Sequence, residues 1–158
     1  MRMTKTNALR MLEKANIPYR TIEYEVDEAH ICGEDVAKKT GLPLEQVFKT
    51  IVLKGERTGY AVFCLPVNKE LNLKKAAAVI HDKKIELVHV KDLLKLTGYI
   101  RGGCSPVGMK KKFPTYFDYT AENFDEISVS AGVRGCQMIV GAKALIGFVE
   151  AVLVDVTE

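Results

Sequence analysis

The sequence predicts an α+β fold: a single domain over residues 1–158 with a large curved mixed β-sheet and flanking short helices. Three observations lead to this prediction. A length of 158 residues fits one domain. Two pairs of β-rich segments, 47–54 with 60–67 and 126–130 with 136–140, have the spacing of hairpins. Helical segments fall between the strands without the regular strand–helix–strand order of a doubly wound sheet.

The first third of the chain is expected to mix helix and strand. Ala8 and Leu12 lie one helical turn apart, and Thr4 or Thr6 can cap the helix that they predict over 6–15. The elements that follow are a strand over 19–25, a polar loop over 27–32, a helix over 33–40 ended by Gly41, and a helical turn over 43–46.

The remaining elements follow the first hairpin. They are a helix over 71–80, a strand over 84–90, a helix over 90–96 ended by Gly98, a strand over 113–119, the second hairpin, a helix over 142–148 and a strand over 151–156. Pro114 has no N–H to donate, so we expect it at a strand start or on an edge strand.

The charge is distributed unevenly along the chain. The net charge is only +3, but residues 69–112 carry eleven basic and four acidic side chains, whereas residues 113–158 carry two basic and seven acidic ones. A central basic segment can face phosphate groups, or it can simply solvate helix surfaces. The four cysteines form no CxxC pair and there is no signal or membrane segment, so we expect a cytoplasmic protein with reduced thiols.

Lys49 lies in the middle of an apolar strand. Period-2 alternation places it on the same face as Val47, Ile51 and Leu53, where an ammonium group is costly to bury. Either the aliphatic stem packs while the charged end reaches solvent, or the ammonium serves a functional site.

The segment 99–108 is the least regular part of the chain. Gly102 and Gly103 expose backbone N–H groups and tolerate positive φ, which suits a turn that donates to a developing negative charge. A plain connection between strands is the alternative. Ser105 does not fit a nucleophile elbow, because the next residue, Pro106, has no N–H to donate, so Ser105 is expected to bond its own turn.

Other nucleophile or metal sites have little support from the sequence. Cys104 could act with His30, His81 or His89, but nothing fixes their geometry. His30 and Cys32 alone are too few ligands for a metal site.

Three segments together resemble the YbaK/EbsC family of trans-acting editing factors, which is similar to the editing domain of bacterial prolyl-tRNA synthetases. They are residues 47–50 (VFKT), 98–108 (GYIRGGCSPVG) and 130–135 (SAGVRG). The resemblance implies an α+β editing domain that deacylates mischarged Cys-tRNA(Pro), with Cys-tRNA(Cys) as a further substrate, without metal or cofactor. In this family the cysteinyl thiol is thought to attack its own ester, releasing a thiolactone and tRNA.

The resemblance also implies roles for individual residues. Lys49, Gly102 and Gly103 are the expected catalytic residues. The expected substrate-binding residues are Tyr24, Cys32, Thr50, Ser105, Ser130, Gly132 and Arg134. The expected tRNA-binding residues are Lys74, Lys75, Lys110, Lys111 and Lys112. The implied partners are mischarged tRNA and prolyl-tRNA synthetase.

Two departures from the family pattern leave alternatives open. Cys32 falls near a position where some relatives have an aromatic residue, and the segment 136–139 lacks an acidic residue that relatives often carry. A different substrate such as Ala-tRNA(Pro), a non-catalytic module that binds tRNA or a synthetase, and an enzyme that depends on Cys104 therefore stand beside the main prediction.

Overall fold

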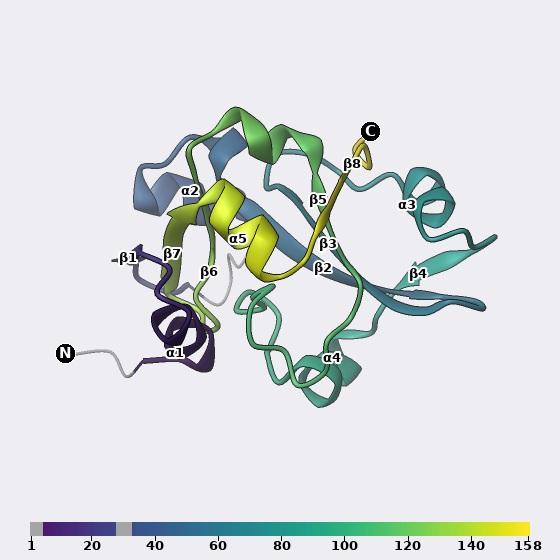
Figure 1. The fold of residues 1–158 in the computed structure, drawn as a ribbon, viewed down its shortest axis with the longest axis horizontal. Coiled ribbons are helices and arrows are strands. Elements are labelled where there is room, and N and C mark those ends of the chain that lie inside the picture. The colour runs from purple at the N-terminus through teal and green to yellow at the C-terminus, as the bar shows by residue number, and fades with distance from the viewer. Residues whose placement is uncertain (1–4, 28–32) are drawn as a thin grey trace.

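The computed structural model describes residues 5–27 and 33–158, and its helices and strands follow the predicted order (Figure 1). The first half contains α1 (Asn7–Lys14), β1 (Tyr19–Glu23), α2 (Gly33–Thr40), the 3₁₀ helix η1 (Leu44–Gln46), β2 (Phe48–Gly55), β3 (Gly59–Pro66), α3 (Leu73–Val79) and β4 (Ile85–Leu87). The second half contains α4 (Val90–Thr97), β5 (Thr115–Asp118), η2 (Tyr119–Asn123), β6 (Glu126–Ser130), β7 (Cys136–Gly141), α5 (Ala142–Phe148) and β8 (Val152–Val154).

The strands confirm the mixed α+β class but divide into two sheets instead of one large sheet. One sheet has the order β4-β2-β3-β5-β8, antiparallel from β4 to β3 and parallel from β3 to β8. The other is antiparallel, with the order β1-β7-β6. A single parallel bridge between Val47 and Ser128 connects them. On its N-terminal side the bridge is bounded by η1, which ends immediately before Val47.

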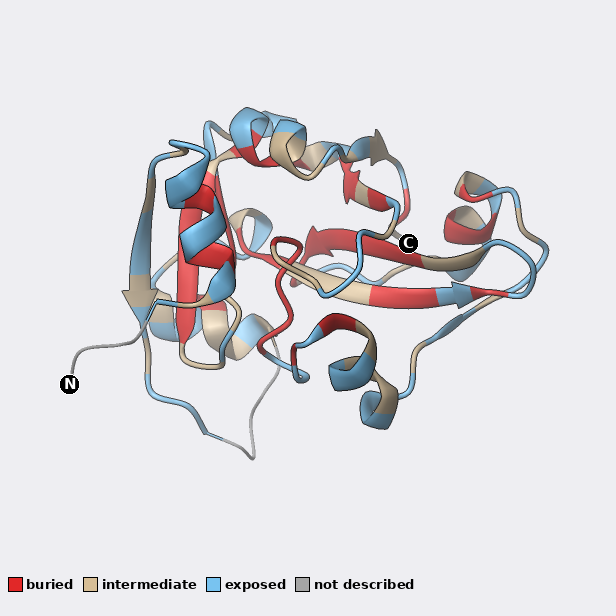
Figure 2. Ribbon diagram, turned by 60° about the horizontal axis from the view of Figure 1, so that its bottom comes forward, coloured by how far each residue is buried: buried red, intermediate tan, exposed pale blue. Residues whose placement is uncertain are grey.

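Strand β2 separates two apolar cores, as the predicted alternation requires. Phe48 and Val52 pack in the larger core with Phe117, whereas Leu53 packs with Phe63 in a second core under α3. Both cores appear as runs of buried residues along the central strands in Figure 2. Because successive side chains of a strand point to opposite faces, one eight-residue strand supplies both cores.

Two local features refine the sequence-based expectations. Pro114 does precede a strand start, but β5 lies between β3 and β8 and is not an edge. The carbonyl of Pro114 accepts the Val62 N–H at 2.8 Å, so its missing donor leaves the ladder intact. The 3₁₀ helix η2 was not predicted. Asp118 caps it by accepting from the N–H and hydroxyl of Thr120.

Helix α1 is anchored to a distant loop through its cap. The Thr6 hydroxyl oxygen accepts the Leu9 N–H at 3.2 Å, which confirms Thr6 as the N-cap. The same hydroxyl donates to the Ala131 carbonyl at 2.5 Å. The cap therefore joins the first helix to the turn that connects β6 and β7.

We expect Thr6→Ala to lower the free energy of unfolding by about 1–2 kcal/mol, because both the cap and the bond to Ala131 are lost. Chemical denaturation measures the change. Thr6→Ser keeps the hydroxyl and should retain most of the stability. A Thr6→Ala protein as stable as the wild type would contradict this role.

Candidate active site

A cavity of about 490 Å³ lies at an open edge of β2. On this edge, Val47 bridges Ser128 of β6, and the Val52 carbonyl accepts the Val88 N–H just before β4 pairs with β2. Over residues 48–51, no strand in the described part of the chain pairs with that edge. The backbone of β2 therefore faces the cavity, and side chains from both faces of the strand line it.

The cavity brings Lys49 and Gly102 together, although 53 positions separate them in the sequence. Lys49 is half-buried in β2, and Gly102 comes from the turn after α4. Arg101 also lines the cavity. Lys49 and Arg101 are the charged residues among the described lining. Cations at these positions favour a ligand that carries or develops negative charge.

Apolar side chains form most of the remaining wall. Val88, just after β4, and Val90 and Leu93 of α4 line the cavity together with Ser130 and Gln137 of the second sheet. Apolar walls lower the local dielectric constant and strengthen the field of a cation.

The turn over residues 99–108 is held rigidly from within. Gly98 ends α4 in the left-handed region at φ +85°. The buried Tyr99 hydroxyl donates to the Val107 carbonyl at 2.5 Å, and burial raises the pKa of Tyr99 to about 12. The Ser105 hydroxyl oxygen accepts the Val107 N–H at 3.3 Å, as expected for a turn residue. Ser105 is fully buried inside the turn and does not line the cavity, so the structure does not place it for substrate binding.

The two glycines of this turn have different roles. Gly102 has φ +86° and lines the cavity. Gly103 donates its N–H to the Ile100 carbonyl at 2.9 Å, so this amide is occupied. The expectation that both amides donate to an oxyanion is therefore corrected for Gly103, and only Gly102 remains a candidate donor.

Gly103 instead allows two loops to touch. A Cβ at this position would lie 3.0 Å from the Arg134 amide nitrogen and 3.1 Å from the Val133 backbone. The contact joins the 99–108 turn to the 131–135 turn, and the Arg134 side chain reinforces it by donating from Nε to the Arg101 carbonyl at 2.7 Å. Backbone this close leaves no room for a side chain.

The other predicted substrate residues are divided among several places. Thr50 and Ser130 line the cavity. Tyr24 and Arg134 line a small adjoining hollow that shares Gly102 with the cavity. Gly132, with φ +105°, packs against the Tyr99 ring and shapes the turn without lining either space. Cys32, like His30, lies outside the described residues.

Among the charged and amide side chains that line the cavity, sequence reasoning missed Arg101 and Gln137. Arg101 stands beside the glycine pair, which is a signal that could have identified it. Gln137 is buried and its side-chain oxygen accepts the Ser128 hydroxyl at 2.8 Å. With the oxygen occupied, the amide NH₂ is the group left to donate to a ligand. No pattern marks a single Gln on a buried strand as functional.

The cysteines of the described region are buried, and their thiols stay protonated near neutral pH. Burial raises the pKa of the Cys104 thiol to about 12, although Cys104 lines the cavity. Burial likewise raises the pKa of Cys64 to about 12. A thiolate is the nucleophilic form, so neither thiol is poised to attack near neutral pH. Across residues 5–27 and 33–158, no cluster of three or more His, Cys, Asp or Glu side chains could hold a metal ion.

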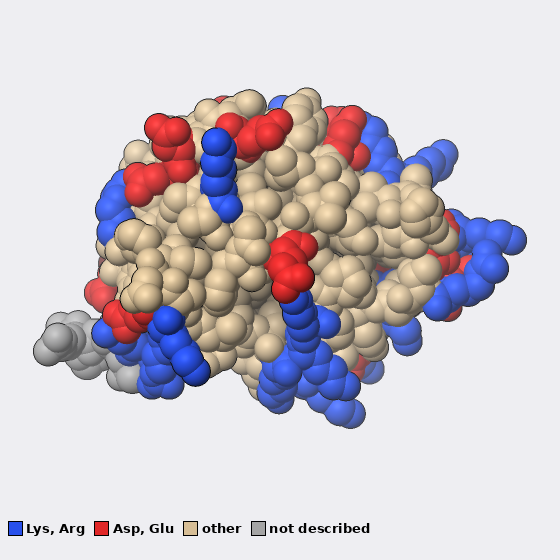
Figure 3. Space-filling model, viewed as in Figure 1, with Lys and Arg blue, Asp and Glu red and all other residues tan. Residues whose placement is uncertain are grey.

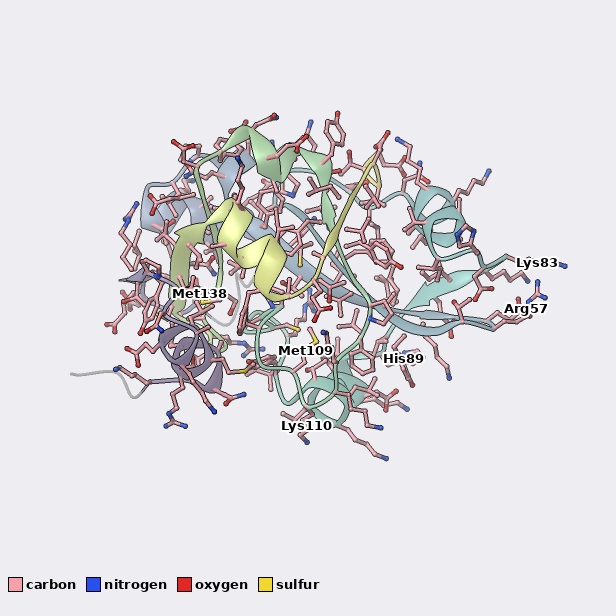
Figure 4. The ribbon with its side chains drawn as sticks, in the orientation of Figure 1. Arg57, Lys83, His89, Met109, Lys110 and Met138 are labelled. Atoms are coloured by element: carbon pink, nitrogen blue, oxygen red, sulfur yellow. The ribbon has the colours of Figure 1, made fainter. Side chains whose placement is uncertain are left out.

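The five predicted tRNA-binding lysines do not form one patch. Lys74 and Lys75 belong to α3, and Lys75 is bound to the Asp155 carboxylate and the Thr157 carbonyl. The segment 110–112 lies elsewhere. Lys110 packs over Gly98 at the end of α4 (Figure 4), and Lys112 pairs with Glu150 just after α5. The two groups flank different parts of the molecule (Figure 1).

Comparison with known proteins agrees with the fold, a mixed α+β domain with a cavity at the edge of one central strand. The family profile "Aminoacyl-tRNA editing domain" matches residues 27–148. The chain belongs to this aminoacyl-tRNA editing family, as its resemblance to the YbaK/EbsC proteins predicts.

Two relatives show how the family extends. A protein of Enterococcus faecalis named as a candidate Cys-tRNA(Pro)/Cys-tRNA(Cys) deacylase, EbsC, is 44% identical over 97% of this chain and 93% of its own length. The proline–tRNA ligase of Fervidobacterium nodosum is 35% identical over 49% of this chain, which covers 13% of the ligase.

A crystal structure described as a candidate trans-editing enzyme for prolyl tRNA synthetase superimposes with a TM-score of 0.83. It shares 22% identity over 96% of this chain and 92% of its own, so it confirms the fold alone. Within the described residues, no helix has the length and apolar character needed to cross a membrane.

We expect Gly103→Ala to destabilise the protein by about 1–3 kcal/mol, because the new methyl group must push two loop backbones apart. Gly147→Ala is the matched control. A Cβ at Gly147, in α5, would meet no atom within 4 Å, so alanine should stabilise the helix by about 0.5–1 kcal/mol. Thermal unfolding separates the two variants, and a Gly103→Ala protein that melts at the wild-type temperature would refute the packing role.

Proposed function

We propose that this protein is a trans-acting deacylase that removes cysteine from mischarged Cys-tRNA(Pro) and from Cys-tRNA(Cys). The observation that carries the proposal is the cavity at the open edge of β2. There Lys49 of β2 and Arg101 lie together with the Gly102 turn among the lining residues. The 44% identical relative with a name of this kind supports the substrate class.

The size and lining of the cavity fit the aminoacyl end of a tRNA. About 490 Å³ is within the range of small-ligand sites, enough for an aminoacyl ester and its terminal nucleoside but not for more of the nucleic acid. The cations Lys49 and Arg101 can stabilise the oxyanion that forms when the ester is attacked. We assign Thr50, Ser130 and the Gln137 amide to orienting the amino acid and ribose.

We propose that the substrate supplies the nucleophile. The cysteinyl thiol forms an S–C bond to its own carbonyl, the ester C–O bond to the ribose breaks, and the thiol proton passes to the departing ribose oxygen. The products are a thiolactone of cysteine and a tRNA with a free hydroxyl. The protein contributes proximity and positive charge, which favour the thiolate and the intermediate. The buried, protonated Cys104 takes no part.

The biological reason for such an activity is the similar size of cysteine and proline. One pocket rejects the smaller of two similar side chains only weakly, so a second site is needed to clear errors. We therefore propose mischarged tRNA and prolyl-tRNA synthetase as partners, in the cytoplasm where tRNA is charged.

A second candidate is editing of a different ester, such as Ala-tRNA(Pro). It is favoured by Gln137, a neutral group in a segment where relatives often carry an acid. Alanine has no thiol, so its removal would need water as the nucleophile. A panel of Cys-, Ala- and Pro-charged tRNA(Pro) separates the two. Thiol-dependent cleavage predicts release from Cys-tRNA alone, whereas binding without any turnover would identify a non-catalytic module.

We expect Lys49→Ala to lower kcat/KM for Cys-tRNA(Pro) by about 100-fold, the typical effect of removing one group that stabilises an oxyanion. The measurement is release of cysteine from purified Cys-tRNA(Pro). Lys143→Ala, which removes an exposed lysine of α5, is the control and should act like the wild type. Equal activity of Lys49→Ala and Lys143→Ala would exclude the role assigned to Lys49.

We expect Cys104→Ser to keep the wild-type rate and pH profile. The pKa of Cys104 is raised to about 12, so this thiol stays protonated between about pH 6 and pH 9. The attacking thiol belongs to the substrate and has an ordinary pKa of about 8.5, so the rate should rise with pH as the thiolate forms and then level off. Loss of activity in a folded Cys104→Ser protein would favour an enzyme that depends on its own cysteine.

A further inference from the structure

A second cavity, of about 550 Å³, lies at the far end of β2 and is rimmed by lysines. We call it the lysine groove. Lys54, Lys74, Lys83 and Lys84 line it, and Glu56 and Glu86 are its acidic lining residues, so the described lining is net positive. Its floor is apolar and comes from Leu73 and Ala77 of α3 and Ile85 of β4.

The lysine groove continues the candidate active site along the same edge of the sheet. On β4, Ile85 and Glu86 line the groove, whereas the next residues, Leu87 and Val88, line the active-site cavity. On β2, residues 48–52 line the cavity and residues 54–55 line the groove. Five residues of extended strand separate Lys49 from Lys54, a span of about 17 Å.

The tip of the lysine groove is pre-ordered by Asp82. Its carboxylate accepts the Arg57 and Thr58 N–H groups, both at 2.9 Å, and the Lys83 N–H at 2.7 Å. These backbone hydrogen bonds hold the pKa of Asp82 well below its usual range, so the carboxylate stays charged and bonded. The β2–β3 turn is thereby fixed against the start of β4. Figure 4 shows Arg57 and Lys83 side by side at this tip.

The distribution of charge over the rest of the surface also favours a polyanion that runs from the cavity toward the lysine groove. Figure 3 shows acidic side chains along the upper edge of the surface, around the position that η2 occupies in Figure 1, and basic side chains at the lower edge and at the hairpin end. Helix α5 itself carries one charged residue, Lys143. A polyanion that enters the cavity with one end is repelled on the first side and attracted on the second.

We propose that the lysine groove binds the RNA backbone of the tRNA just before its aminoacylated end. This inference rests on the proposed function, which places the aminoacyl ester in the adjoining cavity. Lysine suits the role because a flexible point charge can follow phosphates without a fixed geometry. The exposed floor side chain of Leu73, at 44% exposure, offers an apolar contact for a sugar or base. Lys75, already held by Asp155, is excluded from this contact.

Two competing roles for the lysine groove lead to different expectations. Lysines on an edge strand such as β4 can simply prevent association between sheets, in which case they leave tRNA binding unchanged. An acidic peptide segment is the alternative ligand. RNA is favoured over it because the groove lies on the residues of β2 and β4 next to those that line the candidate active site.

The experiment compares two triple variants with equal changes in net charge. Lys74→Glu/Lys83→Glu/Lys84→Glu reverses the lysine groove. Arg10→Glu/Lys14→Glu/Lys143→Glu reverses three exposed cations on α1 and α5. Three assays are run on each full-length protein: binding of uncharged tRNA(Pro) across a salt series, deacylation of Cys-tRNA(Pro), and deacylation of 3′-cysteinyl-adenosine, which contains no phosphate backbone. Thermal unfolding checks that both variants fold.

We expect the groove variant to raise the Kd for tRNA at least tenfold at about 0.1 M salt, and to reduce the slope of log K against log salt by about 2. KM for Cys-tRNA(Pro) should rise similarly, while cleavage of 3′-cysteinyl-adenosine stays at the wild-type rate. The control variant should lose little in any assay.

Each remaining result has a defined meaning. Equal losses in both variants, or tRNA binding unchanged in the groove variant, would overturn the inference. Binding of an acidic peptide that depends on the groove, with normal tRNA binding, would overturn it in favour of a protein ligand. If the wild type cleaves neither ester, the proposed function fails. The binding of uncharged tRNA then still decides whether the groove holds RNA.

Discussion

The architecture of this protein depends on an unpaired stretch of one central strand. Strand β2 pairs with β3 along its whole length, but within the described residues its other edge meets β6 at only one bridge and β4 only over Leu53–Gly55. Between these contacts its edge borders a cavity instead of another strand. An exposed strand edge is normally a liability in a folded protein. Here the gap also separates the two sheets and leaves room for a ligand.

The turn that brings Gly102 to the cavity is held in place by a second turn, over residues 131–135. Gly103 allows the 99–108 turn to approach the backbone of Val133 and Arg134, and the Arg134–Arg101 hydrogen bond fixes their relative position. Thr6 ties helix α1 to the same region through Ala131. A group that is to act on a substrate from a loop must be held to within a fraction of an ångström, and these contacts would supply that rigidity to Gly102 in the role proposed for it.

Electrostatics connects this site to the surface around it. The cavity holds two cations against apolar walls, and the lysine groove continues its positive potential along β4. A tRNA is attracted over a long range by such a surface, whereas the cavity has room only for its aminoacyl end. In our proposal the cavity binds the reactive end by shape and by charge that develops in the reaction, while the lysine groove supplies affinity for the phosphates.

The order and type of nearly all elements follow from local signals in the amino-acid sequence, whereas their combination depends on the folded chain. Amphipathic spacing, threonine caps, glycine stops and alternation along β2 involve neighbours within a few residues, and the structure agrees with them. The same local logic identified Lys49 and the glycine turn, because a cation in an apolar strand and two adjacent glycines are unusual wherever they occur. It did not identify η2, whose cap is a single Asp118 side chain.

Contacts between residues far apart in the chain decide how the elements combine. They divide the strands into two sheets, bring Lys49 to Arg101 and Gly102, and place Gln137 at the cavity. The different roles of Gly102 and Gly103 also became visible only in three dimensions, because a folded turn shows which amide is bonded and which backbone presses against it. Local propensity carries no information on such distances, since they are set by packing that only the whole chain provides.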